Sequence, residues 1–279
     1  MKTAKILLMT LCSLVVLSCA KNKTYSYQEY GLDCPVKSIK VTAYEASSKF
    51  GEVVKGDLKW NGHYLAEFNS VGNIITLTEY INDGDLYRVT KYKYNEDDNV
   101  TDVSEYDEDG KLQYNQSLEY KGILLAKVTF TTEEEIYVNE FFRDGETIIK
   151  KTTHHNGELR SVVKYNKNDK TGAEWVCYDK DGKEQSRGSS ILNEDGKVTR
   201  CNLNDKDYYE VTWNEKGLPV YLKNAELYNS SYVSSYNYCD GSIFYIEYEY
   251  DNKGNWIKQT LFEGELKKPV TISERVIVY

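Results

Sequence analysis

Short runs of alternating apolar and polar residues fill most of the chain. In the run 243–250, for example, Phe244, Ile246 and Tyr248 share one face, while glutamates 247 and 249 lie on the other. A period of two, with many aromatic and β-branched residues, is typical of half-buried strands. After residue 18, no apolar period of 3.6 residues is sustained over a helical length. The pattern therefore predicts an all-β protein.

Turns with glycine separate these runs at intervals of about 12 residues. In the clearest of them an Asp or Asn side chain accepts backbone N–H groups, and Gly then takes a positive φ. Fifteen of the 18 glycines follow this spacing. The turns predict a long antiparallel β-meander of about 20 short strands. Four turns show the design best: Asp107–Gly110, Asp179–Gly182, Asn193–Gly196 and Asp251–Gly254.

The turn spacing predicts the strands of the meander, but it does not by itself predict how the whole sheet is arranged. A transmembrane barrel needs a lipid-facing apolar row on every strand, yet Val89, Lys91 and Lys93 share one face of their strand. A soluble curled sheet, an open superhelix and a propeller-like closure remain as alternatives. We expect a single-layer twisted or superhelical repeat sheet, because no longer period modulates the turns. Tyrosine suits such a sheet, since its ring packs across strands while its hydroxyl stays in water.

The N-terminus carries an export signal. Lys2 and Lys5 precede a short apolar stretch that is too short to span a bilayer as a helix. The stretch ends in Val16-Leu17-Ser18-Cys19, which resembles the bacterial lipobox. We therefore expect a lipoprotein signal peptide over 1–18, lipid attachment at Cys19, a tether over 19–36 and a β-hairpin repeat domain over 37–279.

The turn sequences resemble a known family. The segment Tyr248–Lys258 is similar to the repeat unit of the YD-repeat (RHS-like) lipoproteins of the Bacteroidota, and Tyr106–Gly110 and Tyr178–Gly182 match its shorter core. The resemblance covers roughly residues 40–279 and implies β-rich repeat structure in an envelope protein, with no catalytic residues. In such lipoproteins an acidic cluster after the lipidated Cys often directs export to the cell surface. Residues 20–23 contain none, so we expect the periplasmic face of the outer membrane.

Composition and charge exclude several classes of protein. The chain has 26 Tyr, 18 Gly and only 3 Pro, unlike a collagen, a polytopic membrane protein or a disordered tail. Its net charge is −9 and becomes more negative when Lys2 and Lys5 leave with the signal. No basic track could follow a phosphate backbone, so nucleic acid is not an expected partner.

Catalytic and metal-binding patterns are weak. The histidines after the signal are His63, His154 and His155, and the last two are adjacent, so they point to opposite faces of a strand. The Asp-rich turns do not have the ligand spacing of a calcium loop. We therefore expect no metal, no cofactor and no enzymatic activity. An envelope glycan hydrolase stays open as an alternative, since 44 carboxylates could hide an acid pair.

Four cysteines remain after Cys19, at positions 34, 177, 201 and 239, and they allow three disulfide connectivities. Cys177 and Cys201 fall on strands that are two spacings apart, or roughly 9.6 Å. That exceeds the roughly 7 Å Cα separation of a disulfide. Reduced thiols are favoured, with the pairing of the others left open.

The expected function is non-catalytic. We expect a lipid-anchored envelope protein whose sheet binds a glycan or another envelope protein, with a purely structural spacer as a further alternative. Aromatic side chains on a sheet can stack on sugars or take apolar groups of a partner. The candidate binding residues are Trp175, Trp213, Trp256, Tyr248 and Tyr250.

Overall fold

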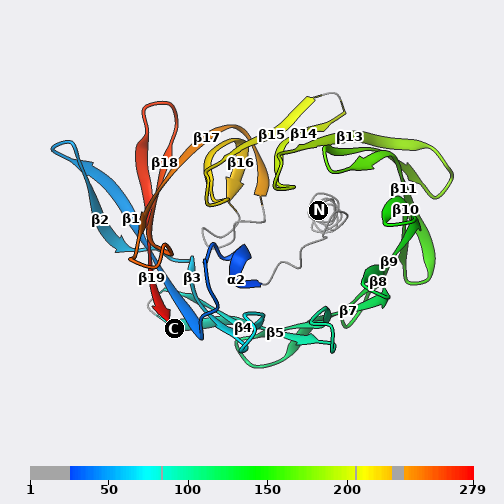
Figure 1. Ribbon diagram of the computed structural model, residues 1–279, viewed down its shortest axis with the longest axis horizontal. Helices are drawn as coiled ribbons and strands as arrows, with labels where there is room; N and C mark the ends of the chain where they lie inside the picture. Colours follow the sequence, from blue (N-terminus) through cyan, green and yellow to red (C-terminus); the bar gives the residue numbers. More distant parts are fainter. Residues whose placement is uncertain (1–25, 83, 205, 228–235) are drawn as a thin grey trace. The chain divides into compact units, whose positions relative to one another are not determined.

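The structure, a computed structural model, describes residues 26–82, 84–204, 206–227 and 236–279. The expected signal peptide, Cys19 and the tether as far as residue 25 lie outside these residues. The described part holds one short helix and nineteen strands, which confirms the all-β class (Figure 1). In the same part of the chain, no helix has the length and apolarity needed to cross a bilayer.

The helix α2 spans Ser26–Glu29. The strands are β1 (Ser38–Lys49), β2 (Glu52–Leu58), β3 (His63–Phe68), β4 (Ile74–Ile81), β5 (Asp85–Tyr94), β6 (Val100–Asp107), β7 (Leu112–Lys121), β8 (Leu124–Thr131), β9 (Ile136–Asp144), β10 (Thr147–His155), β11 (Glu158–Asp169), β12 (Gly172–Asp179), β13 (Glu184–Leu192), β14 (Val198–Leu203), β15 (Lys206–Trp213), β16 (Pro219–Leu227), β17 (Tyr236–Tyr250), β18 (Trp256–Glu263) and β19 (Lys268–Val278).

The chain divides into two compact units that interleave along the sequence. The first unit contains residues 92–105 and 112–208, and the second contains residues 23–91, 106–111 and 209–279. In the first unit, β7 to β14 pair one after another in antiparallel ladders. In the second unit, β15 to β19 pair in the same way, as do β3, β4 and β5.

The first and last strands of the chain are hydrogen-bonded to each other. Strand β1 pairs with β19 from Ser38↔Val278 to Glu45↔Thr271, and its other edge pairs with β3. All nineteen strands of the described residues belong to one sheet, so this ladder closes it into an antiparallel barrel. Strand β2 lies outside that circuit, because it pairs with the end of β1 alone among the described strands.

The expectation of an open single-layer sheet, twisted or superhelical, is therefore wrong. An open meander of this length would leave a row of unpaired N–H and C=O groups on each edge strand. Pairing between β1 and β19 satisfies both edges over residues 38–45 and 271–278. The strand order and antiparallel sense agree with the expected meander; closure is what differs.

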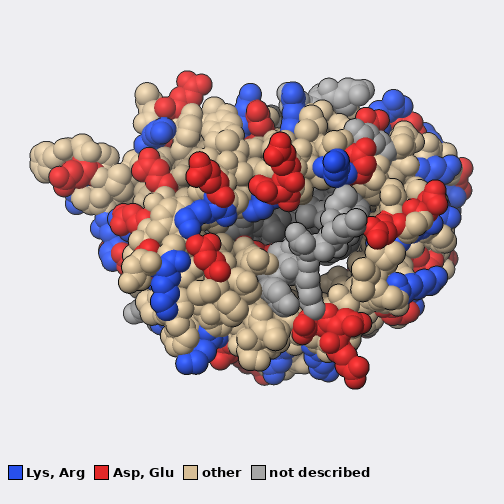
Figure 2. Space-filling view, viewed as in Figure 1, with Lys and Arg blue, Asp and Glu red and all other residues tan. Residues whose placement is uncertain are grey.

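The two faces of the sheet differ in polarity within each unit. In the second unit, Ile39, Val41 and Ala43 of β1 are fully buried, while Lys40 on the opposite face is exposed. In the first unit, the buried face carries an apolar cluster made of Leu125, Val128, Phe141 and Ile148. Acidic and basic side chains are interspersed on the surface seen in Figure 2. Each unit thus buries one face and exposes a charged one.

The turn chemistry expected from the sequence is confirmed. Asp179 Oδ1 accepts the N–H groups of Asp181 and Lys183 at 3.0 and 2.9 Å. Gly182 follows with φ at 82°. Asn193, Asp107 and Asp251 make the same pair of hydrogen bonds in their own turns.

Candidate functional site

Residues 26–37, which we call the strap, pack onto strand ends of the second unit. The strap begins with α2, which stops because Gly31 takes a left-handed φ of 67°. Gly31 N–H then reaches Gln28 O at 2.9 Å, and Leu32 N–H reaches Tyr27 O at 3.1 Å, as in a Schellman motif. A Cβ at Gly31 would lie 2.5 Å from Leu218 Cδ2. Both the turn and the close packing therefore require glycine.

The strap buries apolar side chains against β3 and the turn that follows it. Tyr30, Leu32 and Val36 are all buried. The Tyr30 ring meets the Phe68 ring edge-on at 5.5 Å between centroids. The N–H of Tyr27 donates to Gly72 O at 3.0 Å. The part of the expected tether that the structure describes is therefore a packed element rather than a free linker.

A buried guanidinium holds the end of α2. Arg275 is 5% exposed, and its Nη1 donates to the backbone carbonyl of Tyr30 at 2.9 Å. Its Cζ lies 3.3 Å from the centroid of the Trp256 ring, a cation–π contact. Burial lowers the pKa of Arg275, and the phenol of Tyr64 opposes that effect. A cation at the C-terminal end of a helix also interacts favourably with the exposed carbonyls there.

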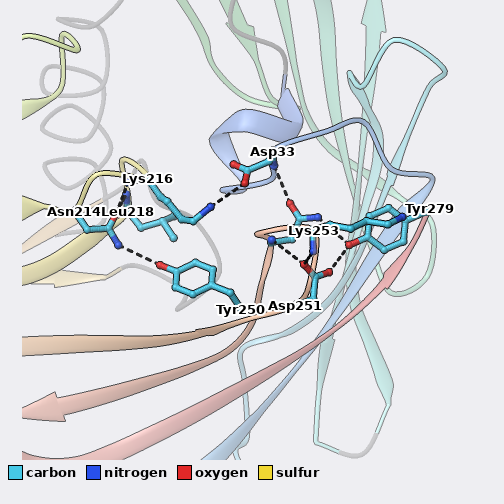
Figure 3. A network of polar contacts seen from close by, with 9 residues as sticks. Asp33, Asn214, Lys216, Leu218, Tyr250, Asp251, Lys253 and Tyr279 are labelled. Atoms are coloured by element: carbon cyan, nitrogen blue, oxygen red, sulfur yellow. Dashed lines mark hydrogen bonds and ion pairs between the residues drawn. The ribbon is translucent and has the colours of Figure 1, made fainter.

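Two hairpin turns lie beside the strap (Figure 3). Between β15 and β16, Asn214 Oδ1 accepts the N–H groups of Lys216 and Leu218, each at 3.0 Å. Between β17 and β18, Asp251 Oδ1 accepts the N–H groups of Lys253 and Asn255, each at 2.9 Å. The sequence encodes both turns in the same way, with Asx first and Gly at the fourth position.

Asp33 of the strap connects to both turns. Its N–H donates to Asn255 Oδ1 at 2.8 Å, and its carboxylate pairs with Lys216 Nζ at 2.8 Å. Asn255 Nδ2 donates in turn to the hydroxyl of the C-terminal Tyr279 at 2.8 Å. The Tyr279 hydroxyl donates to Asp251 Oδ2. The strap, two turns and the last residue of the chain thus form one polar network (Figure 3).

The network shifts the titration of its members. Burial by itself would raise the pKa of Asp251, but hydrogen bonds from Tyr279 and from two backbone N–H groups outweigh it, and the pKa lies below 3.8. Burial, followed by the hydrogen bond to Asp251, raises the pKa of Tyr279. The hydrogen bond to Asp33 raises the pKa of Lys216. Near neutral pH, Asp251 is therefore ionised and Lys216 is protonated.

Three of the expected binding residues gather at this network. The Trp256 ring is 2% exposed and lies 6.1 Å from the ring of Tyr248. The Tyr248 hydroxyl donates to Pro219 O at 3.0 Å, and burial raises the pKa of Tyr248. Tyr250 is 36% exposed, and its hydroxyl accepts a hydrogen bond from Asn214 Nδ2 at 3.2 Å. These aromatics contact the chain's own strap and turns.

The remaining expected residues lie elsewhere. Trp213 is half-buried at the end of β15. Trp175 is 3% exposed in the first unit, where it packs closely over Gly188. Neither Trp175 nor Trp256 presents its ring to a ligand at the surface. Cys19, the expected site of lipid attachment, lies outside the described residues.

Sequence reasoning missed the polar members of the site, Asp33, Asn255, Arg275 and Tyr279. One signal was available at Asn255, because a Lys stands at the same position in the turns that end at residues 111, 183 and 197. An asparagine there exchanges a flexible charged chain for an amide that can both donate and accept. Arg275 has no comparable local signal, since its partner Tyr30 is 245 residues away.

His63 and His155 each contact neighbouring groups of the protein itself. His63 is buried, its Nδ1 accepts the N–H of Ala43 at 3.2 Å, and its Nε2 faces Lys59 O at 2.7 Å. A ring that carries a proton on Nε2 and a lone pair on Nδ1 satisfies both contacts. His155 stacks on Tyr137 at 4.3 Å and lies 3.4 Å from a carboxylate oxygen of Glu135. Across the described residues, no three His, Cys, Asp or Glu side chains group together as metal ligands would.

Cys34, Cys177 and Cys201 are free thiols. Burial raises the pKa of Cys177, which lies beside Lys151 on the covered face of the first unit. Such a thiol is less reactive than an exposed one. The side chain of Cys239 lies outside the described part.

Comparisons with known proteins give distant likenesses. No family model matches the chain, and no curated protein matches it. A porin-like protein from Bacteroides uniformis aligns with 87% of this chain and 96% of its own, at 11% identity and a TM-score of 0.39. The TcdB2-TccC3-TEV structure aligns with 78% of this chain at 14% identity and a TM-score of 0.23, and this chain covers 12% of it. Neither is described as a YD-repeat or RHS protein, so that resemblance stays a prediction.

Proposed function

We propose that this chain is a lipid-anchored protein of the bacterial envelope, attached through Cys19 to the outer membrane and facing the periplasm. Its role is the non-catalytic binding of another envelope protein. The proposal combines the lipobox-like segment that ends at Cys19 with the packing of the strap that follows it.

The strap is the observation that carries the proposal. Six residues lie between Cys19 and Ser26, and seven extended residue steps reach about 24 Å. Ser26 begins an element that Arg275, Asn255 and Lys216 hold to the second unit. A lipid on Cys19 would therefore keep this end of the second unit close to the membrane surface, as a short anchor rather than a long spacer.

The exposed face of the sheet supports a water-facing barrel. In the second unit, Lys55 pairs with Glu274 and Lys258 pairs with Glu249 across strands. In the first unit, Lys127 pairs with Glu119. A lysine on a lipid-facing strand costs roughly 2–4 kcal/mol near the bilayer midplane. Cross-strand pairs of this kind suit water, and they favour attachment by lipid over insertion of the strands.

A protein partner is favoured over a glycan. The glycan hypothesis needs clustered exposed aromatic rings, but Trp175 and Trp256 are buried. Trp60 is 63% exposed and stands in the loop before β3. Single exposed aromatics are ordinary surface residues. Open strand edges can form hydrogen bonds with the backbone of a protein, which a sugar lacks.

The anchor can be tested in cells. We expect wild-type protein in the membrane fraction with an acylated N-terminal cysteine, and Cys19→Ser protein unacylated and released by mild washing. Cys34→Ser is the matched control, because it removes a thiol and leaves the lipobox intact. Membrane attachment and mass unchanged by Cys19→Ser would refute the proposal.

The water-facing barrel needs a second measurement. We expect the chain that begins at Lys21 to fold and remain monomeric in buffer without detergent, by circular dichroism and light scattering. A chain that aggregates in buffer and folds only in detergent micelles would instead indicate strands in contact with lipid.

A further inference from the structure

Strands β1 and β19 separate before either of them ends. Their ladder runs as far as Glu45↔Thr271. Beyond that pair, β1 continues to Lys49 and pairs with β2, while β19 begins at Lys268 and pairs with β18. Figure 1 shows the β1–β2 and β18–β19 hairpins diverging from this point within the second unit. We call the space between residues 46–49 and 267–270 the notch.

The side chains of the notch explain why the ladder stops. If the register continued, Ser48 would face Lys268, and Lys49 would face Lys267. Like charges directly opposite each other destabilise an antiparallel pair. Pro269 also lacks an N–H group to donate. Every charged residue on these two edges, 46–49 and 267–270, is a lysine.

The ends of the two hairpins are apolar. Phe50 is 107% exposed and Leu266 is 97% exposed, and the continued register would place them opposite each other. Phe50 has a φ of 53° and Gly51 a φ of 85°, in a two-residue turn where Asn-Gly is the favoured pair. A phenylalanine is strained in that conformation, and its fully exposed ring gains no packing that would offset the strain. An isolated two-stranded hairpin is also only marginally stable in water.

We propose that the notch binds one extended, acidic segment of another envelope protein, inserted as a strand between β1 and β19. The inserted backbone would satisfy the edges that the two strands leave open. Its carboxylates would pair with Lys49 and Lys268, and its apolar side chains would contact Phe50 and Leu266. Lys49 and Lys268 already face Glu52 and Glu263 across their own hairpins, and an inserted strand would bring its carboxylates to the other side of each lysine. The inference rests on the proposed binding role and names its surface and partner class.

The test uses the purified full mature chain and two synthetic peptides. One seven-residue peptide alternates glutamate with valine, and the other carries lysine in place of each glutamate. We expect the acidic peptide to bind at least about tenfold more tightly by fluorescence anisotropy, since charge complementarity separates the two. In hydrogen exchange, the acidic peptide should protect the amides of residues 46–49, Lys268 and Val270 that point into the notch.

Variants locate the binding. Lys49→Glu combined with Lys268→Glu should reverse the preference between the peptides. The control Lys121→Glu with Lys180→Glu, at exposed hairpin ends elsewhere, should keep it. Phe50→Asn suits the turn better and should fold at least as well, yet weaken binding about threefold or more. Equal binding of both peptides, or amides 46–49 already as protected in the free chain as residues 38–45, would overturn the inference.

The anchor and the notch can fail separately. Loss of acylation at Cys19 would leave peptide binding measurable on the same chain. A lipidated chain that binds neither peptide would retain the anchor and exclude this partner class.

Discussion

Two hairpin turns of this protein have the same local geometry and different surroundings. Asp179 and Asp251 each accept two backbone N–H groups at 2.9–3.0 Å. Gly182 and Gly254 follow with φ values of 82° and 84°. The first turn ends in an exposed lysine, whereas the second ends in Asn255, which is fully buried beneath the strap.

The comparison separates the residues that form the turn from the residues that connect it to the strap. Asx and Gly form the hairpin in either place, because their hydrogen bonds are local. Within the Asp251 turn, the residues that bond and pack against the strap are the two after the Gly, Asn255 and Trp256. The Asp251 turn therefore becomes part of the site through the residues that follow its Gly.

The largest difference between the turns should appear at the fifth position after the Asp. Trp256→Ala removes a buried ring that supports Arg275 and Gly31, so we expect a loss of about 3–5 kcal/mol in the free energy of unfolding by urea. Glu184→Ala, at the same position of the other turn, should lower the free energy of unfolding by about 1 kcal/mol or less. Similar losses in both variants would mean that the strap adds nothing to this turn.

The fourth residue after the Asp should give the next largest difference between the two turns. Asn255→Ala leaves the N–H of Asp33 without its acceptor and removes the bond that the Tyr279 hydroxyl accepts, which should cost about 1–3 kcal/mol. Lys183→Ala removes an exposed side chain and should stay within about 0.5 kcal/mol. Limited proteolysis adds a second readout, because a loosened strap should be cut earlier than the strands. Cleavage of the strap at the wild-type rate in Asn255→Ala would contradict its role.

Substituting the glycines tests backbone and packing together. Ala at a positive φ costs about 1–2 kcal/mol in either turn. A Cβ at Gly182 would meet nothing within 4 Å, but at Gly254 it would lie 2.5 Å from Asp33 Oδ2 and 2.9 Å from Lys216 Nζ. We therefore expect Gly254→Ala to destabilise by about 1 kcal/mol more than Gly182→Ala in urea unfolding. Equal losses would show that Asp33 moves aside freely.

The sequence predicted the parts of the fold that depend on neighbouring residues. Alternation and the Asx–Gly turns operate within one hairpin, and both were found as expected. Closure of the sheet depends on Ser38 meeting Val278, which no local period encodes. The sequence therefore favoured an open sheet, and the pairing of β1 with β19 corrects it.

The candidate site was predicted in part for the same reason. Aromatic enrichment pointed to Trp256, Tyr248 and Tyr250, and they do lie together. Trp256 packs beside Gly31 of the strap, more than 200 residues away, and the hydroxyls of Tyr248 and Tyr250 bond to Pro219 and Asn214. These distant partners leave no local pattern, so the sequence suggested an external ligand. Arg275 was missed because an arginine on a strand usually faces water, and only the structure shows its burial.

Acid should weaken the turn that begins at Asp251. The pKa of Asp251 is lowered by Tyr279 and backbone N–H groups, despite the opposing effect of burial, so its stabilising contribution is present above pH 3.8 and is lost as pH falls through the lowered value. Asp251→Asn keeps the turn, since Asn214 forms the same one, and removes this titration. The difference in urea midpoint between wild type and Asp251→Asn should shrink below pH 3.8, with Asp179→Asn reporting what both turns share. A difference that is constant from pH 6 to pH 2 would exclude the linkage.

The smallest expected effect concerns the ion pair between Lys216 and Asp33, which joins residues 183 positions apart. Both side chains are partly exposed, so water and salt screen the pair, and Lys216→Met should cost about 0.5 kcal/mol or less in low salt. Lys258→Met is the control, because Lys258 pairs with Glu249 on a neighbouring strand at similar exposure. Hydrogen bonds already seat the strap, so both losses should disappear in about 1 M salt. If Lys216→Met alone keeps its cost there, the amine acts through packing on the Tyr250 ring, 5.2 Å away, rather than through its charge on the strap.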